Sequence, residues 1–364
     1  MKTLKFSILF LLVVLVGCTA TEIDSETSVG YLIPTTNLVE VNPVIETSKL
    51  PPEVMEYIYA GTIGGLGFKV INPEFEIFEE RRLNGIIYFT GEDDYLLAVL
   101  ENISAHDHNF IMKVFINYES LPFRVVGEEN FVDTFNFSLN SGYEISLPFE
   151  LDFSTELEHA TYQLTVAIFG DPERHMADRD AHWSFRYPST YSIIVERQII
   201  FGQGSDVRLN LINTAPIIRR ENRYIPEISI RHNFDTNDFR ESAHFSPHQL
   251  EIVLSPNEEI DLTWIINTAI AQFYEGGLMI ADEYVIVGLL DWNQIPLNGH
   301  DYMFVDVELN ELQHPVDLGY FALTAPSEPG RYELILFVSL TPTGLTDLLF
   351  PLESTLRKTI TVVE

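Results

Sequence analysis

After residue 85, most of the chain alternates apolar with polar residues or carries short apolar runs. These segments are rich in Ile, Val, Phe and Tyr, and Gly, Pro, Asn or Asp separates them, which is typical of β-strands joined by turns. We find no stretch with the apolar spacing of an amphipathic helix of three turns. The pattern therefore predicts an all-β chain.

Two blocks of seven predicted strands flank a mixed segment, residues 202–245. The first block, residues 85–201, has expected strands at Ile86–Thr90, Tyr95–Glu101, Phe110–Asn117, Phe131–Leu139, Tyr143–Phe149, Thr161–Phe169 and Tyr191–Phe201. The second block, residues 246–364, has them at Gln249–Leu254, Ile260–Ile266, Tyr284–Asp291, Asp301–Leu309, Val316–Leu323, Tyr332–Leu340 and Leu356–Val363. The mixed segment is expected to be a connector that adds edge strands, at Val207–Ile212 and Glu227–His232, to one neighbour. Seven short strands suit an immunoglobulin-like β-sandwich, so we predict two such sandwiches in tandem.

The two blocks resemble each other in sequence. Residues 115–123, FINYESLPF, align without gaps with residues 289–297, LLDWNQIPL, and the order of later features also agrees. We therefore predict that the two sandwiches are related by internal duplication. The expected equivalences are Asn117 with Asp291, Tyr118 with Trp292, Pro122 with Pro296 and Tyr162 with Tyr332. The aromatic pair at 118 and 292 is expected to cap the end of each core, and the proline to mark where a strand leaves its sheet.

The stretch from Pro329 to Leu334, PGRYEL, resembles the turn before the penultimate strand of immunoglobulin-like folds, where a tyrosine corner ties strand to loop. The resemblance implies that the hydroxyls of Tyr162 and Tyr332 bond to backbone upstream while their rings pack inward. The expected role of both tyrosines is structural.

The first eighteen residues look like an export signal. A basic start, Met1–Lys5, precedes an apolar run from Phe6 to Val16 that is too short to span a bilayer. The run closes on Leu-Val-Gly-Cys at 15–18, which resembles the lipobox of bacterial lipoproteins. The resemblance implies cleavage after residue 17 and a diacylglyceryl group on Cys18. The alternative is an ordinary secretory signal that happens to contain a Cys.

Lipidation at Cys18 predicts a protein anchored to the cell membrane on its extracytoplasmic face, with the membrane as a partner through the lipid. Residues 19–364 contain no run of eighteen apolar residues, so no second membrane segment is expected. Residues 18–52 are interpreted as a flexible tether and residues 53–84 as a lead-in. The four glycines within 61–67 do not match a phosphate-binding loop, and we interpret them as a turn.

Charge and cysteine content exclude several classes of function. The 54 Asp and Glu residues outnumber the 21 Lys and Arg residues, giving a formal net charge of −33. Such a surface repels phosphate backbones, so we expect no nucleic-acid partner. Cys18 is the only Cys, which excludes a disulfide framework and a Cys-based zinc cluster.

Candidate chemistry is sparse. Four residues of one loop, His175, Asp178, Asp180 and His182, include metal-ligand types, but the interleaved arginines favour a solvated loop that pairs its own charges. His106, Asp107 and His108 form a second group of metal-ligand types, with fewer members. Trp183 is the one tryptophan that we would test as an exposed sugar-binding platform. We assign no catalytic residue, no metal ligand and no cofactor, and the only assigned site is lipidation of Cys18.

These observations predict a non-catalytic structural or interaction module at the cell envelope, with a protein or cell-wall partner. The first alternative is an accessory protein that binds a metal, carbohydrate or peptide through inter-domain or loop surfaces. The second is an enzyme with a dispersed site. Because they differ between the blocks, the loops 171–188 and 268–283 are where we expect function to reside.

Overall fold

The computed structural model describes fifteen segments of the 364-residue chain. They are residues 40–43, 66–71, 86–89, 95–103, 106–152, 161–178, 192–201, 217–222, 229–232, 251–267, 269–271, 278–280, 283–306, 315–340 and 355–364. Within these segments every extended element is a β-strand, and the one helical element is the short 3₁₀ turn η2, Met176–Asp178. The prediction of an all-β chain is confirmed. None of the described segments forms a helix long and apolar enough to cross a membrane.

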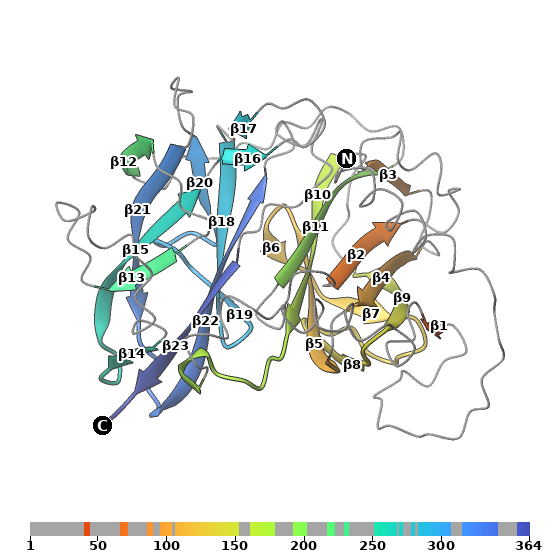
Figure 1. Cartoon of the computed structure of the whole chain (residues 1–364), viewed down its shortest axis with the longest axis horizontal. Helices are drawn as coiled ribbons and strands as arrows, with labels where there is room; N and C mark the ends of the chain where they lie inside the picture. Colours follow the sequence, from red (N-terminus) through yellow and green to blue (C-terminus); the bar gives the residue numbers. More distant parts are fainter. Residues whose placement is uncertain are drawn as a thin grey trace, which may run out of the picture.

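Unit 1 consists of two sheets built from β1 to β11 (Figure 1). In each unit, the sheet that faces the other unit is called the inner sheet, and the remaining sheet is called the outer sheet. Its outer sheet has the order β1 (Glu40–Pro43), β9 (Tyr143–Leu151), β4 (Leu96–Asn102), β2 (Leu66–Ile71), with β7 (Phe123–Val125) also paired to β9. Its inner sheet has the order β3 (Ile86–Phe89), β11 (Ser192–Phe201), β10 (Thr161–Gly170), β5 (His108–Ile116), β6 (Glu119–Ser120), with β8 (Phe135–Leu139) also paired to β5.

Unit 2 consists of two sheets built from β12 to β23, with a separate two-stranded pair, β16 (Ala269–Ala271) and β17 (Leu278–Ile280). Its outer sheet has the order β12 (Ile217–Asn222), β21 (Pro315–Thr324), β15 (Glu259–Asn267), β13 (Ser229–His232). Its inner sheet has the order β14 (Glu251–Leu254), β23 (Thr355–Val362), β22 (Gly330–Leu340), β18 (Glu283–Leu290), β19 (Asn293–Ile295), with β20 (Met303–Asp306) also paired to β18.

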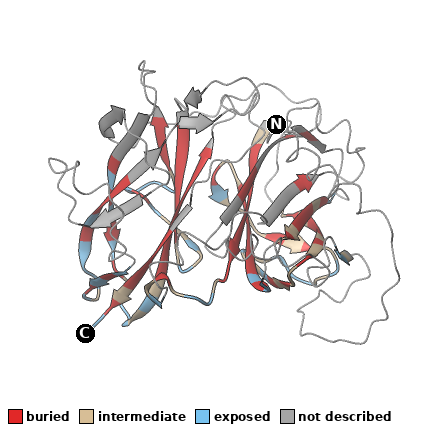
Figure 2. Cartoon of the chain, in the orientation of Figure 1, coloured by how far each residue is buried: buried red, intermediate tan, exposed pale blue. Residues whose placement is uncertain are grey.

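Each unit encloses its own apolar core between its two sheets. In β4, for example, Leu96, Ala98 and Leu100 face the core of unit 1, which is the period of two that a sandwich requires. Figure 2 shows buried residues along the strands of both units. Both units are therefore β-sandwiches.

The two units repeat the same strand pairings. In each inner sheet one edge strand runs parallel to its neighbour, β3 beside β11 and β14 beside β23, whereas the other ladders are antiparallel. The central ladders share one register, because Leu164 pairs with Ile116 in unit 1 and Leu334 with Leu290 in unit 2. An origin by duplication stays a prediction, but this shared register defines equivalent positions in the two units.

A two-residue turn of the same conformation follows β5 and β18. Asn117 and Tyr118 have φ values of 49° and 71°, and Asp291 and Trp292 have 49° and 70°. Positive φ at both central residues is the mark of a type I′ hairpin, for which Asn and Asp are favoured at the first position. Bulky rings at the second position are unusual, so packing of these rings must stabilise the turn.

Equivalent strands fill their cores in different ways. Leu100 of β4 lies opposite Ile145 of β9, whereas Trp264 of β15 lies opposite Gly319 of β21. A Cβ atom at Gly319 would lie 2.1 Å from Cζ2 of Trp264, so the indole needs a glycine there. Trp264 is fully buried and packs in the core of unit 2.

The inner sheets of the two units pack face to face, so the molecule has four layers of sheet (Figure 1). A third apolar cluster joins them. It contains Ile111, Phe115, Tyr118, Ala167, Phe169 and Ile194 from unit 1, and Val285, Val287, Leu289, Phe304, Ile335 and Phe337 from unit 2. This cluster is the inter-unit interface.

Unit 1 begins before residue 85. β1 lies within the predicted tether and pairs with β9, and Val41 packs against the core of unit 1. β2 begins among the glycines that we interpreted as a turn, and its Val70 is fully buried. Both interpretations are therefore wrong at these residues, because the outer sheet needs two further strands to cover the core. The expected strand Val207–Ile212 lies outside the described residues.

The connector supplies both edges of the outer sheet of unit 2, as β12 pairs with β21 and β13 with β15. The proline prediction holds in unit 1, where β6 pairs with the inner sheet and β7, just after Pro122, pairs with the outer sheet. It is wrong in unit 2, because β19 and β20 both pair with β18. The tyrosine corner is confirmed at Tyr332, whose hydroxyl donates to the carbonyl of Glu328 at 2.9 Å.

Candidate functional site: the inter-unit interface

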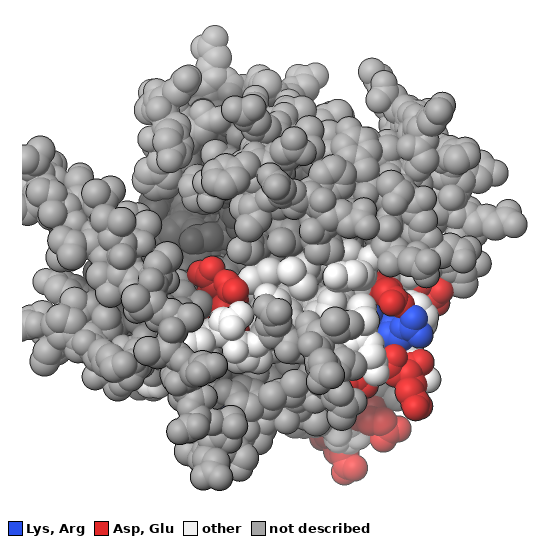
Figure 3. All heavy atoms as spheres, turned by 90° about the vertical axis from the view of Figure 1, so that its right-hand side faces the viewer, with Lys and Arg blue, Asp and Glu red and all other residues white. Residues whose placement is uncertain are grey.

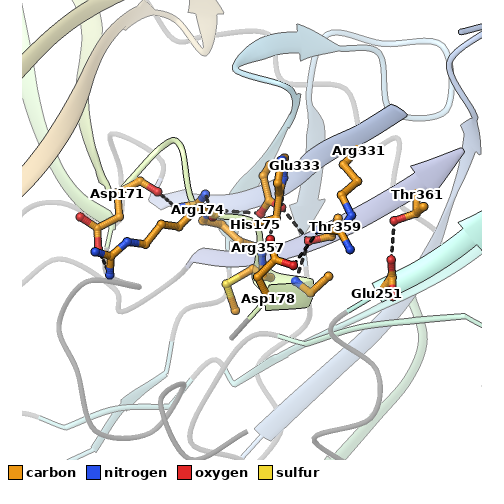
Figure 4. A network of polar contacts seen from close by, with 12 residues as sticks. Asp171, Arg174, His175, Asp178, Glu251, Arg331, Glu333, Arg357, Thr359 and Thr361 are labelled. Atoms are coloured by element: carbon orange, nitrogen blue, oxygen red, sulfur yellow. Dashed lines mark hydrogen bonds and ion pairs between the residues drawn. The ribbon is translucent and has the colours of Figure 1, made fainter. Parts of the chain in front are cut away.

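A short segment of unit 1 crosses to the inner sheet of unit 2. It follows β10, comprises residues 171–178, and is called the strap below (Figure 4). Its 3₁₀ turn η2 lies against β23, where the amide of Ala177 donates to Oγ1 of Thr359 at 2.8 Å. The strap thus adds a polar contact to the apolar interface.

Glu333 of β22 is the acceptor on which the strap converges. Its side chain is 1% exposed, so its carboxylate depends on protein donors. Oε1 accepts from Oγ1 of Thr359 at 2.7 Å and from the amide of Met176 at 3.2 Å, and Nδ1 of His175 lies 3.2 Å from the same oxygen. Oε2 accepts from Nε of Arg357 at 3.3 Å. Groups from both units therefore surround one carboxylate.

Arg357 of β23 is the matching cation, with a side chain that is 2% exposed. Nη1 donates to the carbonyl of Gly170 at 2.8 Å, and Nη2 donates to the carbonyl of Arg174 at 3.0 Å. The guanidinium also lies 5.0 Å from the ring centre of Trp292, within range of a cation–π interaction. Burial lowers the pKa of Arg357, while the charge of Glu333 opposes that shift. Arginine nevertheless stays charged in proteins, so Glu333 and Arg357 form a buried ion pair.

Both ends of the strap are fixed by pairs of polar side chains. At the start of the strap, Oδ1 of Asp171 lies 3.0 Å from Nδ1 of His108, and both side chains are buried. At its end, Arg331 donates to Asp178 at 2.7 Å in an exposed pair. Exposed pairs contribute little to stability, so the buried pairs and backbone contacts hold the strap in place.

Aromatic rings fill the centre of the interface. The ring centres of Phe115 and Phe337 lie 5.2 Å apart, and those of Phe169 and Trp292 lie 5.5 Å apart. At the edge of the interface, the side-chain amide of Gln294 in β19 bonds to the backbone of unit 1. Its Oε1 accepts from the backbone amide of Ser120, and its Nε2 donates to the carbonyl of Tyr118, both at 2.8 Å. Ser120 and Gln294 occupy equivalent positions, so the interface is close to two-fold symmetric.

The predicted caps at positions 118 and 292 pack elsewhere. Tyr118 is fully buried and Trp292 is half-buried, but both lie in the inter-unit cluster rather than at the end of their own cores. That prediction is wrong because a type I′ turn directs these rings to the outward face of the inner sheet, which the other unit covers.

Several candidate residues have partners of another kind. His175 and Asp178 contact Glu333 and Arg331, and His108 contacts Asp171, so each is engaged in the strap. The carboxylate of Asp107 accepts from the amide of Ser141. Among the described residues, no three His, Cys, Asp or Glu side chains are arranged to hold a metal ion. The remaining candidates, Cys18, Asp180, His182 and Trp183, lie outside the described residues.

Glu333 and Arg357 are not identified by any motif in the sequence. One signal was available, because β22 is apolar on both faces: Leu334 and Leu336 face the core while Ile335 and Phe337 face outward. A strand that is apolar on both faces is typical of a sheet covered on both sides. A buried charge next to such a run marks a position that needs a partner.

Lys113 of β5 is a further buried cation near the interface. It is 1% exposed, and Nζ donates to the carbonyl of Asp133 at 3.0 Å and to Oγ1 of Thr134 at 3.1 Å. Burial lowers the pKa of Lys113, against an opposing effect of Asp133.

On the face of unit 1 turned away from unit 2, the charged side chains of the described residues are mostly acidic (Figure 3).

No known protein family matches the chain, and no curated protein matches it in sequence. Solved structures with some likeness include the C-terminal domain of the AgI/II polypeptide BspA of Streptococcus agalactiae (8% identity, TM-score 0.21, 82% of this chain and 100% of that one). A CARDB domain of Pyrococcus furiosus, titled as a complex with di-metal ions, has 9% identity and a TM-score of 0.23 over 44% of this chain and 100% of that one. A red sea bream transglutaminase has 9% identity and a TM-score of 0.23, and the match spans 85% of this chain but only 33% of the transglutaminase. Likeness at this level says nothing about function.

Proposed function

We propose that this protein is a lipid-anchored, extracytoplasmic, non-catalytic structural or interaction module of the cell envelope. The inter-unit interface carries the proposal, because Glu333, Arg357 and the aromatic cluster join two sandwiches into one body. Units joined through a large apolar interface keep a fixed relative orientation, unlike units on a flexible linker. A body of fixed shape suits the display of binding surfaces or the spacing of envelope components.

The distance between the proposed anchor and the folded body fits this role. Cys18 lies 22 residues before Glu40, where β1 begins. A chain of that length spans at most about 75 Å when fully extended. The net charge of −33 adds repulsion from an anionic leaflet. Both features favour a body held off the membrane, where it meets a protein or cell-wall partner.

Metabolic labelling with a fatty acid tests the anchor. We expect the wild-type chain to incorporate label and to fractionate with membranes, and Cys18→Ser to remain unlabelled and uncleaved before residue 18. A Ser48→Cys variant in the Cys18→Ser background is a control for thiol-dependent labelling away from the lipobox. Cleavage and labelling of Cys18→Ser would contradict the proposal.

A further inference from the structure

The inter-unit interface is held differently at its two ends. At one end, the amide of Met176 in the strap donates to Glu333, which lies near the start of β22. Arg357 of the neighbouring β23 donates to the carbonyl of Gly170, the last residue of β10. The end of β10 and the start of β22 therefore meet here, at what we call the strap end. The opposite end holds the start of β10 and the end of β22, and we call it the Gln163 end.

Register places three polar side chains at the Gln163 end. Leu164 faces the core of unit 1, so Gln163 and Thr165 on either side of it point outward from the inner sheet toward unit 2. Ser339 comes two residues after Phe337, on the face of β22 that covers unit 1. The three side chains therefore lie between the two inner sheets.

The polar atoms of these three side chains have no hydrogen-bond partner. All three side chains are at most 1% exposed, and the unpaired atoms are Nε2 and Oε1 of Gln163, Oγ1 of Thr165 and Oγ of Ser339. A buried polar group without a partner loses its hydrogen bonds to water and forms none in their place, which opposes its burial. Closing the interface therefore desolvates four polar atoms at the Gln163 end without replacing their bonds.

The strap end has the opposite balance. The carboxylate of Glu333 accepts from the amide of Met176, and the guanidinium of Arg357 donates to the carbonyls of Gly170 and Arg174. These hydrogen bonds between the units all involve a charged group, and such bonds are stronger than those between neutral groups. The contacts at the strap end therefore resist separation of the units.

The covalent connection between the units is long enough to let the Gln163 end separate. It follows β11, whose Ile200 pairs with Thr161 at the start of β10, so the connection leaves unit 1 at the Gln163 end. Residues 202–216 lead from β11 to β12, and a chain of that length spans up to about 50 Å. The strap, and not the connection, is therefore the contact that limits movement of the units.

We propose that the two units form a hinge, which opens at the Gln163 end while the strap end stays closed. Opening returns water to the polar atoms of Gln163, Thr165 and Ser339. It also separates the rings of Phe115 and Phe337, whose centres lie 5.2 Å apart, and loss of this apolar contact makes the open arrangement a minor state. The hinge goes beyond the proposed function, because it gives the same body a second state in which these rings are exposed.

Two equivalent positions, one at each end, test the hinge through thiol reactivity. Val285 pairs with Ser339 and Ile111 pairs with Phe169, at the same register in the two units. Both side chains are at most 3% exposed and lie in the inter-unit cluster. In a Cys18→Ser background, each variant is treated with dilute maleimide, and its rate is divided by its rate in urea. We expect Val285→Cys to react about tenfold or more faster than Ile111→Cys, because labelling follows the population of the open state.

A further variant tests whether the unpaired atoms favour opening. Gln163→Leu/Thr165→Val/Ser339→Ala removes all four atoms and keeps the approximate shape, so it should slow labelling of Val285→Cys about tenfold or more. If this variant fails to fold, Ser339→Ala alone is used, with a slowing of about threefold expected. The proposal is overturned if Val285→Cys reacts less than about twofold faster than Ile111→Cys, or if removing the unpaired atoms leaves labelling as fast as before.

Discussion

Replacing Arg357 with leucine removes the cation that links Glu333 to the strap. The carboxylate of Glu333 would stay 1% exposed with no counter-charge, and the carbonyls of Gly170 and Arg174 would lose their donor. Breaking a buried ion pair by removing one partner costs about 3–5 kcal/mol, because the remaining charge is buried and uncompensated. A domain is stable by only about 5–15 kcal/mol, so we expect Arg357→Leu to lose a large fraction of the free energy of unfolding.

Urea unfolding followed by tryptophan fluorescence measures this loss. Arg331→Leu is the matched control, since it makes the same substitution on the same sheet but breaks only the exposed pair with Asp178. It should unfold as wild type does. The double variant Glu333→Leu/Arg357→Leu should recover part of the loss, because no charge is left buried alone. The reasoning is refuted if Arg357→Leu loses less than about 1 kcal/mol, or if the double variant is no more stable than the single.

Other substitutions test the packing and the buried lysine. Gly319→Ala places a methyl group 2.1 Å from the ring of Trp264, so it should cost at least about 1–3 kcal/mol in urea unfolding; wild-type stability would contradict that packing. Tyr118→Ala should cost about 3–5 kcal/mol and Trp292→Ala, which is only half-buried, clearly less, with the reverse order disproving their placement. Burial lowers the pKa of Lys113, so below 10.5 the unfolded chain binds more protons than the folded chain. The stability of wild type relative to Lys113→Met should therefore rise from pH 8 to pH 10, and a flat difference would argue against burial of the charged amine.

Most long strands that contribute apolar side chains to a core can be predicted from the sequence pattern. The alternation of β4 and the apolar runs of β10 and β22 predict strands within two residues of those observed. Strands of two or three residues, such as β6 and β19, are too short to show a period, and they were not predicted.

The interface could not be predicted from local pattern. Glu333 and His175 are 158 positions apart, and only the packing of two sandwiches brings them together. An apolar outward face on β22 indicates that something covers it, but not that the cover is the equivalent face of the other unit. The sequence places Tyr118 and Trp292 at the correct strand ends. It does not show on which side of the sheet their rings pack, because it does not show that the other unit covers the outward face.

The central claim is that the inner sheets of the two units cover each other, and the reactivity of a thiol at Ala167 tests it most directly. Ala167 is fully buried, and it lies in the inter-unit cluster on the outward face of β10. In a Cys18→Ser background, Ala167→Cys should resist maleimide under native conditions and react after unfolding in urea. Val253→Cys, at a position 56% exposed on the outward face of the other inner sheet, should react at once. If the cysteine at position 167 reacts as fast as the one at 253 in the folded protein, the two units do not pack through their inner sheets.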